Sequence, residues 1–281
     1  MLIVIPAFEL LSFWVISNTY CMVYIFLLMI GMNLYTTDER ENKALLILLS
    51  MVICWLTLSR AEMSVCMACI VCLISFLPLT QIEMLTLSVP MMVVQLLYLI
   101  ELNYQQAISV KSVYDSMLTP SIQAIMTVAT VGCVIYSFFI NSKFFSWIRK
   151  KINIIVSAIL PGICIAIYFL DKEKYVKSIE SIIYNFKTQY WGYLPALILV
   201  LYIVIALNKK NNFGLIFSTG YVLINLILCL GRKQPLRNGY GDSCNRIMMS
   251  AIPVVFFALI CSVLEIVALR IKENKEQEEY K

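Results

Sequence analysis

The chain has 281 residues, of which 61% are hydrophobic and only 14% are charged, and its mean hydropathy is +0.84. A soluble domain carries about 25% charged residues, because it must cover its surface with polar groups. The composition therefore excludes an ordinary soluble protein and predicts an all-α, polytopic transmembrane helix bundle. The net charge of +5 is small and spread over loops, so we expect membrane lipid and no nucleic acid as a partner.

Apolar segments follow one another along almost the whole chain and predict about ten membrane segments. They cover approximately 2–17, 20–36, 44–59, 64–80, 84–100, 125–141, 153–170, 192–207, 214–230 and 249–269. Several are short for a straight span, so a pair such as 44–59 and 64–80 could form a shallow hairpin. No repeat or linker interrupts the series, which predicts one membrane domain over 1–270 and a charged cytoplasmic tail over 271–281.

The basic residues predict the orientation of these segments. With the C-terminal tail in the cytoplasm, the inside loops hold twelve of the 22 Lys and Arg residues in a shorter total length than the outside loops. Because cytoplasmic loops are enriched in Lys and Arg, both termini are expected to be cytoplasmic.

One long outside loop, 171–191, predicts an amphipathic helix on the outer membrane surface. Its apolar residues are spaced three and four apart and would share one helical face: Val176, Ile179, Ile183, Phe186 and Tyr190. A weaker pattern of the same kind precedes Pro120, so we expect one or two interfacial helices.

The chain contains no histidine, which excludes histidine bases, Ser-His-Asp triads and histidine metal sites. Cys66, Cys69 and Cys72 form a C-x-x-C-x-x-C run. Because apolar residues surround this run, we interpret it as helix packing and expect neither a metal nor a cofactor.

The first polar cluster at the predicted outer face is Ser59-Arg60-Ala61-Glu62. A charged side chain beside lipid is costly, which makes each one a candidate site. Arg60 could clamp a phosphate with its planar fork or pair with Glu62. The alternative is a turn that only marks the membrane boundary.

The second cluster is the outside loop 231–246, with the sequence GRKQPLRNGYGDSCNR. It includes Arg237, and its end predicts a helix capped by Asp242 or Ser243 that holds Arg246 in its first turns. Helix N-terminal N–H groups together with an arginine form an anion site. The alternative is a solvated basic loop at the lipid headgroups.

The order of these features resembles bacterial GT-C glycosyltransferases of the family 39 type, which use polyprenyl-phosphate-linked sugars. Asn18-Thr19-Tyr20-Cys21 is similar to an outer-face element that opens a helix in that family, and Ser59 to Met63 is similar to its arginine-containing turn. Gly241 to Arg246, followed by Pro253, is similar to its last helix start. The resemblance implies that Arg60 and Arg246 contact the phosphate or pyrophosphate of the lipid-linked donor at the outer face of a bacterial plasma membrane. Asp242 would orient the loop, and Glu62 and Arg237 would belong to the same donor-binding site.

The chain also departs from that family. The family's catalytic acid lies in an earlier outer loop, before the first residues matched here, and Cys21 stands at a second acidic position. Inverting transfer needs a carboxylate base, so the catalytic residue is unknown. We expect a C-terminal portion, a truncated chain or a non-catalytic descendant, and a partner chain is one possible source of the missing half.

Two other functions stay open on the sequence. A non-catalytic lipid-handling protein, such as a flippase-like carrier or an assembly subunit in the cell envelope, explains the missing acid equally well. A polysaccharide polymerase or ligase also places arginines in outer loops.

Overall fold

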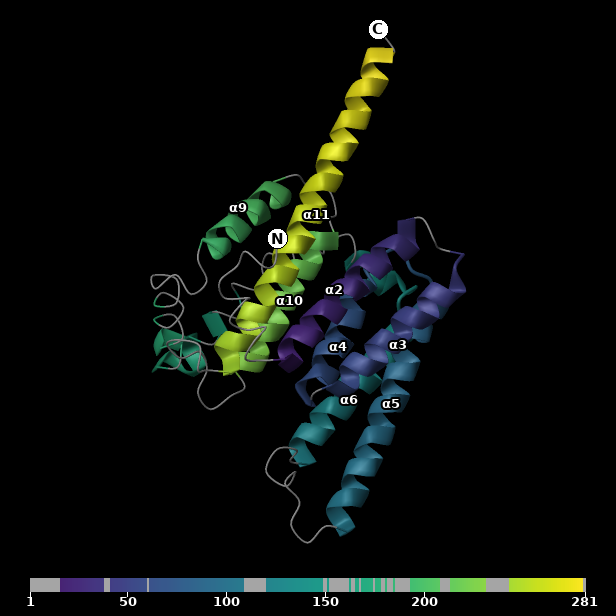
Figure 1. Ribbon diagram of the computed structural model, residues 1–281, viewed down its shortest axis with the longest axis vertical. Helices are drawn as coiled ribbons and strands as arrows, with labels where there is room; N and C mark the ends of the chain where they lie inside the picture. The colour runs from purple at the N-terminus through teal and green to yellow at the C-terminus, as the bar shows by residue number, and fades with distance from the viewer. Residues whose placement is uncertain are drawn as a thin grey trace. The chain divides into compact units, whose positions relative to one another are not determined.

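The computed structural model describes residues 16–37, 41–59, 61–108, 120–148, 193–207, 213–230 and 243–279, with isolated positions between 151 and 184. Side chains are described for a smaller set, which leaves out those of 16–20, 61–62 and 243–250. Figure 1 shows that the ordered elements in this part of the chain are helices. They are α2 (Ile16–Thr37), α3 (Lys43–Ser59), α4 (Ala61–Ile74), α5 (Gln81–Ile108), α6 (Pro120–Phe138), α9 (Leu194–Ala206), α10 (Phe213–Leu230) and α11 (Ser243–Glu279). The prediction of an all-α protein is confirmed for the described residues.

The chain divides into two compact units. The N-terminal unit is Tyr20–Lys150, and the C-terminal unit combines Met1–Thr19 with Lys151–Lys281. Compactness alone does not identify domains that fold independently, so the single membrane domain over 1–270 stays a prediction.

In the N-terminal unit, α2 and α3 form an antiparallel hairpin. Pairs of residues along the two helices show this, because their numbers rise on α2 as they fall on α3: Cys21 with Ser59, Tyr24 with Trp55, and Gly31 with Leu49. At Gly31 the Leu49 side chain packs directly over α2, because an added Cβ would lie 2.5 Å from Leu49 Cδ2.

The helices α4 and α6 run parallel to each other, and α5 runs against both. Cys72 of α4 contacts Cys133 of α6, and Ser75, the residue after the end of α4, contacts Tyr136, three residues further along in both cases. The buried residues of α5 form one stripe with helical spacing: Met84, Leu87, Ser88, Met91, Gln95, Leu99 and Leu102. Leu99 and Leu102 pack against Met126 of α6.

A proline interrupts the hydrogen-bond ladder of α5. Pro90 has no N–H, so the carbonyl of Thr86 lacks its normal donor one turn later. The Ser50 hydroxyl of α3 donates to that carbonyl at 2.8 Å. A neighbouring helix therefore satisfies the backbone group that the proline leaves open, as apolar surroundings require.

In the C-terminal unit, α10 and α11 pack against each other through large apolar residues. Phe217 on α10 and Leu259 on α11 are fully buried, and Ser218 Oγ donates to the Val255 carbonyl at 3.5 Å. Helix α9 joins them through the hydrogen bond from Thr219 Oγ1 to Tyr202 OH, at 3.3 Å.

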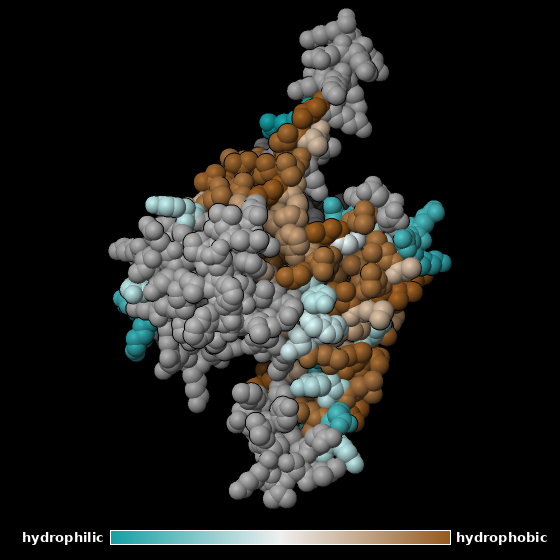
Figure 2. Space-filling view, in the orientation of Figure 1, coloured by the Kyte–Doolittle hydropathy of each residue, from teal (hydrophilic) through white to brown (hydrophobic). Residues whose placement is uncertain are grey.

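Three described helices are long and apolar enough to cross a membrane by length and composition: Gln81–Tyr104, Pro120–Phe138 and Ala251–Ala268. Shorter apolar helices occupy other predicted segments, at Cys21–Thr36, Lys43–Ser59, Met63–Ile74 and Ala196–Ile205. Figure 2 shows apolar residues gathered over the visible face of the N-terminal unit. The helices indicate a membrane protein, while the total of about ten segments stays a prediction.

Candidate functional site

The candidate site is the end of the N-terminal unit where α2 begins and α3 ends, here called the motif end. The thiol of Cys21 and the hydroxyl of Ser59 are 3.3 Å apart, and Ser59 Oγ also donates to the Leu56 carbonyl at 2.6 Å. Cys21 is buried and Ser59 is partly exposed. The packing of α2 on α3 therefore brings together two polar elements that lie 38 residues apart.

One turn further into the hairpin, an aromatic pair supports this contact. The rings of Tyr24 and Trp55 have centroids 4.3 Å apart at a tilt of 47°. Tyr24 lies three residues after Cys21 and Trp55 four residues before Ser59, so both pairs share one side of the hairpin. Tilted aromatic pairs are favourable beyond the apolar area that they bury.

The α3–α4 junction adds charge and backbone donors at the motif end. A single residue, Arg60, separates the last residue of α3 from the first residue of α4. Arg60 lies outside the described residues, and Glu62 is described by its backbone only, as the second residue of α4. The first turn of α4 has N–H groups without helical acceptors, which favour an anion.

The remaining predicted site residues belong to the C-terminal unit. Helix α11 begins at Ser243 and includes Arg246 in its first turn, which confirms the predicted helix start. Arg237 and Asp242 lie outside the described residues, and the Arg246 side chain is not described.

The opposite end of the N-terminal unit, here called the capped end, is held by one carboxylate. Glu83 accepts hydrogen bonds from Tyr35 OH at 2.7 Å, the Thr80 N–H at 2.6 Å and Thr80 Oγ1 at 2.9 Å. The Glu83 N–H donates to Thr80 Oγ1 at 3.3 Å. This is a capping box at the start of α5, with an added bond to the buried Tyr35 of α2.

Two further bonds tie helices together at the capped end. Ser75 Oγ and Tyr136 OH are 2.7 Å apart, and Gln81 Nε2 donates to the Phe138 carbonyl at 3.0 Å. Within the N-terminal unit, α4 and α6 finish at this end and α5 starts there. The polar groups of the capped end hold each other, which indicates a structural role.

The cysteine run lies among packed helices. Cys66 is buried, Cys69 and Cys72 are partly exposed, and Cys72 Sγ lies 3.9 Å from Cys133 Sγ of α6. Among the described residues, no group of three or more His, Cys, Asp or Glu could hold a metal ion.

Two polar side chains in the buried stripe of α5 have no hydrogen-bond partner within the part of the chain that the structure describes. They are Ser88 and Gln95, both fully buried, on either side of Pro90. A buried amide or hydroxyl without a partner is destabilising. Ser88 and Gln95 are therefore two unfavourable polar side chains in the otherwise apolar stripe of α5.

The predicted interfacial helix over 171–191 is described at a few positions. Lys172 lies over the Tyr168 ring at 5.7 Å, and Lys177 pairs with Glu173 four residues earlier. The Glu173 carboxylate raises the pKa of the exposed Lys177 by hydrogen bonding and charge. These contacts are typical of a helix surface, but most of the apolar face named above lies outside the described residues.

Sequence reasoning missed the capping box and the Ser50 bond. Thr80 and Glu83 carry a recognisable signal, since Thr-x-x-Glu before an apolar run predicts a helix start. Ser50 has no comparable signal, because its partner carbonyl is 36 residues away on another helix.

Comparisons of the chain with protein-family models, with curated proteins and with solved structures found no match. The fold alone therefore defines the class, which is that of helical proteins with apolar helices of membrane-spanning length.

Proposed function

We propose that this chain is a GT-C-like glycosyltransferase, or the C-terminal portion of one, that binds a polyprenyl-phosphate-linked sugar. The observation that carries the proposal is the contact between Cys21 and Ser59, at 3.3 Å. Cys21 belongs to the sequence element that resembles the family's outer-face helix start. Ser59 belongs to the element that resembles the family's arginine-containing turn, so the two elements are in contact through these residues. Arg60 follows Ser59 directly and would contact the donor phosphate.

A second phosphate contact would come from α11. Arg246 in the first turn of that helix, with the preceding loop that includes Arg237 and Asp242, combines a guanidinium with free backbone N–H groups. Glu62 would orient Arg60 by pairing with it. The base for transfer is unassigned, and a partner chain would supply the acidic loop.

The proposed setting is the bacterial plasma membrane, with about ten segments, both termini in the cytoplasm and the amphipathic helices on the outer face. Within the N-terminal unit, α3 and α5 both end at the motif end, because α4 starts directly after α3 and α5 runs against α4. Both helix ends would then face outward, as the distribution of Lys and Arg predicts.

The binding test compares two arginines on one helix. Arg246 and Arg270 are 24 residues apart on α11, which is roughly 36 Å along the axis and more than the bilayer core. We expect Arg246→Ala in the full chain, in nanodiscs, to weaken the binding of polyprenyl phosphate about tenfold or more, as for a lost charge-assisted contact. Arg270→Ala should bind like the unmodified chain, and equal affinities for all three proteins would contradict the proposed role of Arg246.

A second candidate, a flippase-like carrier, is favoured by one observation. Each compact unit contains one long helix with an internal proline, Pro90 in α5 and Pro253 in α11. Interrupted helices in two halves are typical of transporters. Movement of polyprenyl phosphate across a sealed vesicle membrane, without sugar transfer, would favour this candidate over the glycosyltransferase.

A further inference from the structure

The stretch that follows α6 combines exposed aromatic rings with cations. Phe139, Phe144 and Trp147 expose 62%, 70% and 55% of their surfaces. Residues 139–150 contain Lys143, Arg149 and Lys150 and no Asp or Glu. We call residues 139–148 the post-α6 surface; Arg149 and Lys150 follow it directly in the sequence and lie outside the described residues.

One side of this stretch is fixed to the N-terminal unit. Ser142 begins a helical turn over 143–148, because its Oγ accepts the Phe145 N–H at 3.2 Å. Phe145 is buried and contacts the rings of Phe76 and Tyr136, with centroids 5.9 and 5.0 Å away. Phe145 therefore fixes one side of the turn against the N-terminal unit, and the residues on the other side of the turn are exposed.

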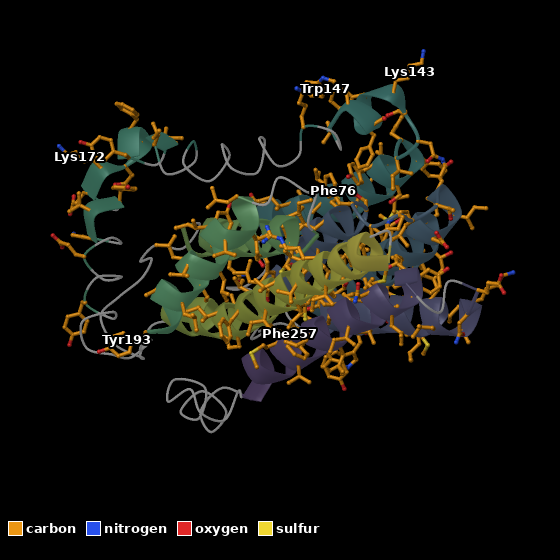
Figure 3. The ribbon with its side chains drawn as sticks, turned by 90° about the horizontal axis from the view of Figure 1, so that it is seen from above. Phe76, Lys143, Trp147, Lys172, Tyr193 and Phe257 are labelled. Atoms are coloured by element: carbon orange, nitrogen blue, oxygen red, sulfur yellow. The ribbon has the colours of Figure 1, made fainter. Side chains whose placement is uncertain are left out.

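The other side of the turn presents Lys143, Phe144 and Trp147. The Phe144 and Trp147 rings are stacked, with centroids 6.4 Å apart and 18° between their planes. Lys143 is one turn before Trp147, and Figure 3 shows both side chains on the outside of this stretch. Two large rings and a cation thus share one exposed face.

The exposed face lies directly after a candidate membrane span, and this position indicates a lipid headgroup as its ligand. Pro120–Phe138 is a candidate membrane span, so the post-α6 surface begins where a span ends and headgroups are found. Aromatic rings prefer that level of a bilayer, and the cations of a stretch that contains no Asp or Glu attract anionic headgroups. We propose that the post-α6 surface binds the headgroups of anionic phospholipids, independently of the function proposed above.

The test measures the binding of individual lipids to the full chain in detergent by native mass spectrometry. The probes are phosphatidylglycerol and phosphatidylcholine with identical acyl chains. The unmodified chain should bind phosphatidylglycerol more tightly, and Lys143→Gln/Lys150→Gln should lower that affinity roughly fivefold for each charge removed. The affinity for phosphatidylcholine should not change.

The matched control is Lys272→Gln/Lys275→Gln, which removes two charges from a tail that also contains Glu273, Glu276, Glu278 and Glu279. It should keep the preference for phosphatidylglycerol. Phe144→Ala/Trp147→Ala changes exposed rings only and should weaken the binding of both lipids. Equal affinity of the unmodified chain for the two lipids, or an equal loss in the control, would overturn the proposal.

Discussion

The two ends of the N-terminal unit use polar residues in opposite ways. At the capped end, Glu83 accepts three hydrogen bonds and joins α2 to the start of α5. At the motif end, the Cys21 thiol lies 3.3 Å from the Ser59 hydroxyl, and Arg60 and Glu62 follow Ser59 in the sequence. The difference teaches that one end stabilises the bundle through its polar groups, while the other is the end where we propose that charged groups bind a ligand.

The largest effect on stability is expected from Glu83→Ala at the capped end. The change removes the capping box of α5 and the acceptor of the buried Tyr35 hydroxyl, and the free energy of unfolding should fall by about 3 kcal/mol. Denaturant titration of the protein in detergent measures this quantity. Glu41→Ala is the control, since Glu41 is exposed, and an equal loss in both variants would show that Glu83 has no special role.

The next largest effect is expected between the two ends, at Gly31. An added side chain would overlap Leu49, so Gly31→Val should lower the free energy of unfolding by about 2 kcal/mol. Gly132→Val is the matched control, because a Cβ at Gly132 meets nothing within 4 Å. If both variants unfold at the same denaturant concentration, the close approach of α2 and α3 is wrong.

Ser50→Ala should have a smaller effect, about 1 kcal/mol, because it removes one hydrogen bond to the Thr86 carbonyl. The cause can be isolated in a double-mutant cycle with Pro90→Ala, which restores an N–H to that carbonyl. In the Pro90→Ala background, Ser50→Ala should lower the free energy of unfolding by less than it does in the unmodified chain. An unchanged cost in the Pro90→Ala background would contradict the link between the proline and the serine.

Cys21→Ala at the motif end should change stability least, by about 0.5 kcal/mol or less, since a thiol is a weak hydrogen-bond partner. The same denaturant titration applies. A loss as large as that of Glu83→Ala would remove the distinction between the two ends.

The sequence predicted helix positions well where apolar runs and caps coincide. The start of α11 at Ser243 was predicted from Asp242 and Ser243. The segment 64–80 was placed wrongly at its end, because α4 stops at Ile74 and Thr80 caps the next helix. Phe76, Leu77 and Leu79 keep this stretch apolar, so hydropathy alone does not mark the boundary. Pro78 and the capping residues mark it.

Contacts between helices could not be predicted in the same way. The pairing of Cys21 with Ser59 depends on how α2 packs on α3, and Gly31 allows that packing by lacking a side chain. A glycine within an apolar run does not specify which helix approaches it. The sequence could therefore predict the separate polar elements of the candidate site, but it could not predict that α2 and α3 bring two of them into contact.

The most direct test of the central claim compares charges at the two ends of α3. Arg60 follows its last residue and Lys43 is its first, so the two are about 25 Å apart along the helix. The measurement is the affinity of the full chain in nanodiscs for polyprenyl phosphate. The account predicts that Arg60→Ala weakens binding about tenfold or more while Lys43→Ala leaves it unchanged; equal affinities, or a larger loss with Lys43→Ala, would contradict a phosphate site at the motif end.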